Sequence, residues 1–236
     1  MTTQAQAKSL HDRMVNELAQ LFPEGDLRRP VFYRAKAGLR FEIGTGAPLG
    51  KCAGGHPRTE YIQRALKRSI TLFHACFPSG PDFLLLDVLV RNDTTRTDIL
   101  DICSHSNLLG DVKEVVCTPH HDEDGTRLQL LFDTRERQPD ILGVLRNTIL
   151  SDFVPDFSAL WQSVFFFDCD RHLLFHLYDD RGLDIASSTP NAIEYLYSAY
   201  NSWILDYDRE QIDSVFKPHH TNPCHGIVQV KNERSI

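Results

Sequence analysis

Hydrophobic and polar positions follow strand and helix periods along the chain, most clearly between residues 164 and 209. Residues 164–167 form an apolar run, and apolar side chains recur at every second position of residues 171–178, so the two segments are predicted to form a β-hairpin. The next four residues, 179–182, have turn composition, and Gly182 can take the positive φ of a tight reversal. A third strand is predicted at residues 183–186.

A helix follows this third strand in the pattern. Thr189 is suited to an N-cap and Pro190 to the first helical position. Four large side chains then fall on one helical face: Ile193, Leu196, Tyr197 and Tyr200. The C-terminal part is therefore predicted to run strand, turn, strand, turn, strand, helix.

Upstream of residue 164, helical and strand patterns alternate. Helical spacing predicts helices over residues 7–22, 57–77 and 139–150, with a short helix around 98–103. The strand pattern predicts a hairpin of residues 31–34 with 39–43, a central strand at 83–90, and a second hairpin of residues 112–117 with 127–132 joined by a polar turn over 119–125.

This mixture of hairpins and helices predicts an α+β fold, with a largely antiparallel sheet and helices packed on it. The chain has no repeat period and no low-complexity linker. Residues 1–236 are therefore expected to form a single domain. If it is subdivided, the boundary is expected near residue 151, between an N-terminal α/β part (1–150) and a C-terminal part (151–236).

Composition narrows the class of protein. Hydrophobic residues make up 42% of the chain and charged residues 24%, as in soluble globular proteins. The formal net charge of −7 disfavours general nucleic-acid binding, which requires a basic face. We find no apolar run long enough to cross a membrane and no secretory signal, so we expect a cytoplasmic protein. The six cysteines form no Cys-x-x-Cys pair, which favours reduced thiols.

Motifs for cofactor binding are weak. The glycine-rich stretch 44–52 resembles a phosphate-binding loop, but Thr45 and Cys52 stand where that motif requires a glycine and a Ser or Thr. We therefore expect no nucleotide, and no cofactor of another kind. Zinc-type ligands gather in the tail, where His219 and Cys224 are the first pair to test, but their spacing matches no known zinc motif.

Carboxylates are dense in the C-terminal part. Asp179 and Asp180 fill one predicted turn, where aspartate is favoured because it bonds local amides. Asp184 interrupts a strand and is expected to pair with Arg181 or Arg209. We favour a structural network of hydrogen bonds and ion pairs.

Two blocks in this part resemble the hallmark of an uncharacterised bacterial protein family. Residues 175–184 read FHLYDDRGLD and residues 200–209 read YNSWILDYDR, and the family shows the same two blocks in the same order. Residues 39–44 and the helix over 64–77 resemble its weaker N-terminal pattern. The resemblance implies a mainly structural role for the signature residues, which are Tyr178, Asp179, Asp180, Arg181, Gly182, Asp184, Trp203, Asp208 and Arg209.

Members of that family often occur beside polymorphic toxin systems, and several are regarded as immunity proteins. The resemblance therefore implies a protein that binds and neutralises a cognate antibacterial toxin domain. The toxin-binding residues are expected in long polar loops, 44–57 and 118–126, the second of which carries His120, His121, Asp122, Glu123 and Asp124.

Two alternatives remain open. A metal-assisted enzyme would use the acidic cluster of Asp179, Asp180 and Asp184, in a pocket where Asp184, His176 and Arg209 converge. A general protein-binding module would share the fold without toxin specificity. Toxin binding accounts best for the acidic balance and for the lack of an assembled catalytic motif.

Overall fold

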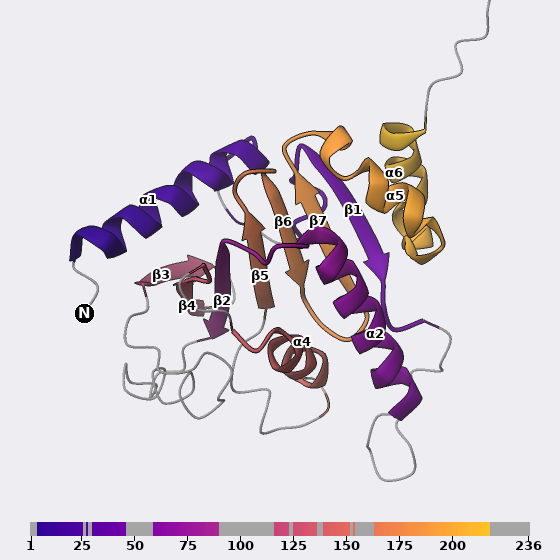
Figure 1. The fold of residues 1–236 in the computed structure, drawn as a ribbon, viewed down its shortest axis with the longest axis horizontal. Helices are drawn as coiled ribbons and strands as arrows, with labels where there is room; N and C mark the ends of the chain where they lie inside the picture. Colours follow the sequence, from indigo (N-terminus) through magenta and orange to yellow (C-terminus); the bar gives the residue numbers. More distant parts are fainter. Residues whose placement is uncertain are drawn as a thin grey trace, which may run out of the picture.

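A computed structural model describes residues 4–25, 27, 30–45, 59–89, 116–122, 125–135, 139–151, 153 and 163–217. Within these residues, one antiparallel sheet of seven strands is covered by helices on both faces (Figure 1). The predicted α+β class and largely antiparallel sheet are confirmed. The elements in chain order are α1 (Gln4–Leu21), β1 (Ala37–Glu42), α2 (Thr59–Cys76), β2 (Phe83–Leu89), β3 (Val116–Asp122), β4 (Gly125–Asp133), α4 (Ile141–Leu150), β5 (Ser163–Asp168), β6 (Leu173–Leu177), β7 (Gly182–Ser187), η1 (Pro190–Ala192), α5 (Glu194–Ala199), η2 (Asn201–Trp203), η3 (Asp206–Asp208) and α6 (Arg209–Phe216).

The strand order is β1-β7-β6-β5-β2-β4-β3, and every neighbouring pair is antiparallel. The predicted meander β5-β6-β7 is present, because its short connections bring consecutive strands together. β1 lies beside β7, and β2 lies beside β5. The sheet therefore combines strands from both sides of residue 151.

The core lies in two layers, one on each face of the sheet. Helices α2, α4, α5 and α6 cover the face that carries Phe166 and Phe175, whereas α1 covers the face that carries Phe165 and Phe167. Successive side chains of a strand point to opposite faces, so a strand covered on both faces is apolar at most positions. This explains the apolar runs at residues 83–86 of β2 and 164–167 of β5.

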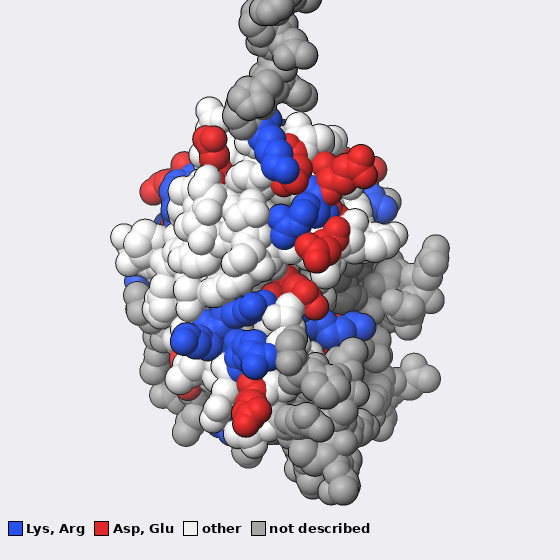
Figure 2. All heavy atoms as spheres, turned by 90° about the vertical axis from the view of Figure 1, so that its right-hand side faces the viewer, with Lys and Arg blue, Asp and Glu red and all other residues white. Residues whose placement is uncertain are grey.

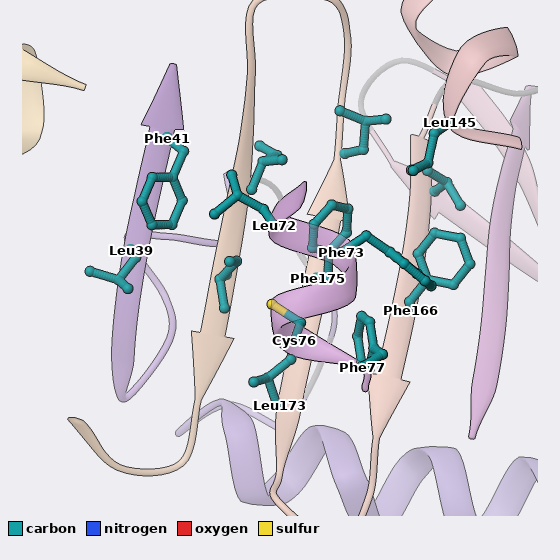
Figure 3. Packing of buried hydrophobic residues seen from close by; sticks show 14 of the residues in the cluster. Leu39, Phe41, Leu72, Phe73, Cys76, Phe77, Leu145, Phe166, Leu173 and Phe175 are labelled. Atoms are coloured by element: carbon teal, nitrogen blue, oxygen red, sulfur yellow. The ribbon is translucent and has the colours of Figure 1, made fainter. Parts of the chain in front are cut away.

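Aromatic side chains of α2 dock this helix on the sheet. The ring centroid of Phe73 lies 4.9 Å from that of Phe166 and 5.8 Å from that of Phe175, with the ring planes steeply inclined. Phe77 packs beside Phe73 at 5.0 Å. Figure 3 shows these rings meeting between the helix and the central strands. Edge-to-face contacts of this kind add to the stabilisation from burial alone.

The predicted first hairpin, of residues 31–34 with 39–43, is wrong. Residues 31–35 form turns, in which the amides of Arg34 and Ala35 both donate to the Val31 carbonyl at 3.1 Å. The strand over 39–43 exists as β1, but it pairs with β7, in which the partner residues are 140 to 150 positions away. Local pattern identified the strand and could not identify its partner.

The predicted polar turn over residues 119–125 is shorter in the structure. β3 and β4 pair as far as Asp122 opposite Gly125, so Pro119, His120 and His121 belong to β3. Within the described residues β3 is at the edge of the sheet. Proline is tolerated there because no neighbouring strand needs its missing N–H. The predicted helix at 98–103 and most of the predicted strand at 112–117 lie outside the described residues.

The predicted single C-terminal helix is instead a series of short helices from η1 to α6. The chain is extended at Ile204 and Leu205, where it crosses the edge of β1. Ile204 bridges to Phe41, and the Leu205 amide donates to the Arg40 carbonyl at 3.0 Å. The break in the helix thus covers an edge of the sheet that would otherwise be open. No helix among the described residues is long and apolar enough to cross a membrane.

Candidate functional site

The strongest polar cluster in the described part of the chain centres on Arg40 of β1. Arg40 stands opposite Asp184 of β7, which in turn stands opposite His176 of β6, so the three side chains share the sheet face that α1 also covers. Arg40 donates to both carboxylate oxygens of Asp184, from Nε at 2.7 Å and from Nη2 at 3.0 Å. The backbone amide of Phe32 donates to the same carboxylate at 3.1 Å. Asp184 is fully buried.

A second carboxylate completes the cluster. The Tyr33 hydroxyl donates to Asp208 Oδ1 at 2.6 Å, and Arg40 Nη1 donates to Asp208 Oδ2 at 3.3 Å. Aromatic rings also surround the guanidinium carbon, with centroids 4.8 Å away for Tyr33 and 5.9 Å away for Tyr178. Arg40 therefore connects β1, β7 and η3 with the turns before β1.

Burial and charge shift the pKa values of Arg40 and Asp184 in opposite directions. Burial lowers the pKa of Arg40, but the hydrogen bonds and charge of Asp184 outweigh burial, and the net pKa is raised. Burial raises the pKa of Asp184, and Arg40 only partly opposes that rise. Arg40 is thus held as a cation, and each partner compensates the charge of the other.

The turn between β6 and β7 ties the same region to α2. Asp179 accepts from the Arg181 amide and from Arg181 Nε, each at 2.8 Å. Asp180 accepts from the hydroxyl of Tyr61 on α2. Burial, followed by the hydrogen bond to Asp180, raises the pKa of Tyr61. The two adjacent aspartates therefore have different tasks: Asp179 closes its own turn, and Asp180 anchors a helix.

Gly182 is required by close packing, and the predicted positive φ is wrong. Among the described glycines only Gly25 and Gly80 have positive φ. A Cβ placed on Gly182 would lie 2.9 Å from the Phe41 carbonyl oxygen and would collide with the Tyr178 hydroxyl. Only hydrogen at this position lets Tyr178 lie across the start of β7.

A family model described as "Domain of unknown function (DUF3885)" matches residues 14–208. The chain belongs to the DUF3885 family. This match confirms the resemblance to an uncharacterised domain family, and it spans the sheet together with the cluster around Arg40. No curated protein and no solved structure matches the chain.

In this DUF3885 protein the expected partners of Asp184 are wrong. Arg181 bonds Asp179, and Arg209 bonds the carbonyls of Asn201 and Ile204, at 3.1 and 3.0 Å, together with Asp206. Asp184 pairs with Arg40 instead. His176 is a cross-strand neighbour of Asp184, as the enzyme hypothesis requires, and it stacks on Phe165 with centroids 4.3 Å apart.

Sequence reasoning missed Arg40, Tyr33 and Tyr61. All three lie more than 100 residues from the carboxylates that they contact, so no local motif joins them. One signal was present in the pattern: Arg40 is a cation on the face of β1 opposite Leu39 and Phe41, and Asp184 is an anion within an apolar strand. Only the register of β1 on β7 turns these two anomalies into a pair.

The structure describes the remaining candidate residues only in part. His120, His121 and Asp122 lie on β3, although their side chains are not described, and Glu123, Asp124, His219 and Cys224 lie outside the described residues. Only residues 44 and 45 of the loop 44–57 are described. In the described part of the chain, no group of three His, Cys, Asp or Glu side chains is arranged to hold a metal ion.

Proposed function

We propose that this DUF3885 protein is an immunity protein, which binds and neutralises a cognate antibacterial toxin domain in the cytoplasm of the producing cell. Two lines of reasoning support the proposal. The family resembled in the two signature blocks occurs beside toxin systems, and the geometry of the signature residues suits a binding scaffold better than a catalytic site.

The observation that carries the proposal is the engagement of the signature side chains with the fold itself. Asp184 accepts from Arg40 and from a backbone amide, and Asp208 accepts from Tyr33 and Arg40. Asp179 bonds its own turn, and Asp180 bonds α2. Side chains that join elements in this way build a rigid frame, on which variable surface residues can recognise a partner.

The same contacts argue against catalysis by the acidic cluster. A pair of catalytic carboxylates must face a shared space where a substrate can enter. Here Asp179 and Asp180 are directed to different partners, and Asp184 is fully buried under the Arg40 guanidinium. Using these groups as acids or bases would break the bonds that connect β1, β7 and α2.

Growth protection is the direct test. The protein domain encoded immediately beside this chain would be expressed in a bacterial host, with and without the chain. We expect that the domain alone stops growth, that co-expression restores it, and that the two purified proteins elute as one stoichiometric complex. A toxic neighbour that the chain neither binds nor neutralises would overturn the proposal, as would a neighbour without toxicity.

A further inference from the structure

Three cations lie close together on α2: Arg64, Lys67 and Arg68, named here the α2 basic patch. Residues three and four positions apart on a helix are neighbours, so these like charges repel one another and destabilise the helix slightly. The chain as a whole has a net charge of −7. A concentration of positive charge is therefore unexpected here unless it has a use.

The described carboxylates near the patch, Glu42 and Glu60, form no ion pair with it. Within the described residues none of its three cations forms an ion pair. Arg64 donates to the Thr45 carbonyl and Arg68 donates to the Glu42 carbonyl, the latter at 2.7 Å, and Lys67 is exposed. Burial lowers the pKa of Arg68, the charge of Glu42 opposes this, and the charge of Arg64 lowers it further. An approaching anion would relieve that repulsion.

An aromatic side chain of the family signature adjoins the patch. The Arg68 guanidinium lies over the Trp203 ring, 5.0 Å from its centroid, and Tyr200 packs against Trp203 at 5.1 Å. Both aromatic residues are only partly buried. Figure 2 shows the face that carries these elements: Lys and Arg side chains gather beside a broad area without charge, and a few Asp and Glu side chains lie among them. Arginine, tryptophan and tyrosine are the residues most enriched at the energetic centres of protein interfaces.

We propose that the α2 basic patch, together with Trp203 and Tyr200, is the surface on which the chain docks an acidic face of its toxin partner. This inference rests on the proposed function and adds the chemistry of the contact. Carboxylates of the partner would pair with Lys67 and Arg68, and its apolar side chains would pack on the two aromatic rings.

A protein partner fits the surface better than a nucleic acid does. Binding to a polyanion requires cations spread along a groove or face, whereas the three cations of the patch are confined to one helix. A patch of three cations beside uncharged aromatic surface is matched by a compact acidic area, as protein interfaces provide.

The test uses the full chain and the purified domain encoded beside it, in calorimetry and stopped-flow binding. Lys67→Glu reverses a charge at an exposed side chain that forms no hydrogen bond or ion pair within the described residues. Lys36→Glu is the matched control, because Lys36 is also exposed and forms no ion pair within the described residues. Lys36 lies just before the start of β1, whereas the patch contacts the end of β1 through Arg68. We expect Lys67→Glu to raise Kd by at least about tenfold, mainly through slower association, and Lys36→Glu to leave Kd unchanged within about twofold.

The outcomes separate the two proposals. If the wild-type chain does not bind the neighbouring domain, the proposed function fails and this inference fails with it. If the wild-type chain binds but Lys67→Glu binds equally well, or Lys36→Glu is weakened as much, only the docking surface is wrong. Tight binding of a single-stranded oligonucleotide that is lost in Lys67→Glu would overturn the assignment in favour of a nucleic-acid ligand.

Discussion

Asp184 shows how much of the fold rests on a single buried side chain. Its carboxylate is buried, and it is the partner of a cation that also contacts Asp208. Burying an ion pair costs desolvation, so the pair adds little net stability compared with apolar residues of the same size. Removing one partner is different, because the remaining charge stays buried without compensation.

We therefore expect Asp184→Ala to lower the free energy of unfolding by about 3–5 kcal/mol, measured by urea denaturation. Asp206→Ala serves as a control, since the Asp206 side chain is 93% exposed and its pair with Arg209 lies at the surface. That variant should change stability by no more than about 0.5 kcal/mol. Equal effects of the two substitutions would show that the Arg40 network contributes nothing beyond surface electrostatics.

Gly182 lies in the same region as the Arg40 cluster, but its neighbours constrain it by close packing rather than by charge. We expect Gly182→Ala to destabilise the fold by about 1–3 kcal/mol, because the new methyl group overlaps Tyr178 and approaches the Phe41 carbonyl. In the double variant with Tyr178→Phe the hydroxyl is gone, so part of this loss should be recovered. A double-mutant cycle checks the idea: purely additive effects would mean that the tyrosine hydroxyl is not what excludes a side chain at this position.

At the scale of elements, local signals were sufficient wherever partners are close in sequence. The meander β5-β6-β7 followed from apolar runs separated by turns, and the helices α1, α2 and α4 followed from helical spacing. The position of β1 did not follow, because its pairing with β7 depends on the whole molecule. Strand identity is encoded locally, whereas strand order is set by burial of both sheet faces.

In the candidate site too, contacts between residues close in sequence could be predicted and contacts between distant residues could not. The sequence identified Asp179, Asp180 and Asp184 as a structural network, and the first of these bonds its own turn as aspartate commonly does. The partners Arg40 and Tyr61 come from β1 and α2, and no spacing rule connects them to residues 180–184. The α2 basic patch could not be predicted from the sequence either, because Trp203 comes to lie beside Arg68 only in the folded chain.

At the scale of the molecule, the two parts of the chain on either side of residue 151 complete each other. The C-terminal part supplies β5, β6 and β7, whereas β1 and β2, on the two sides of this meander, come from the N-terminal part. The helices α1 and α2, on opposite faces of the meander, also come from the N-terminal part. Without them, Phe165 and Phe175 would face water on opposite sides of the sheet.

This arrangement predicts a single cooperative unfolding unit. We expect the full chain to unfold in one transition, with the same midpoint by far-ultraviolet circular dichroism and by tryptophan fluorescence, because Trp203 packs against α2 through Arg68. Residues 1–150 and 151–236, expressed separately, should each lack a cooperative transition. Each part would lose strand neighbours and core contacts that the other part supplies, and it could not bury enough apolar surface to offset its conformational entropy. Two resolved transitions, or a fragment 151–236 with native near-ultraviolet dichroism, would instead show that the C-terminal part folds on its own and that the shared sheet is only a docking of two domains.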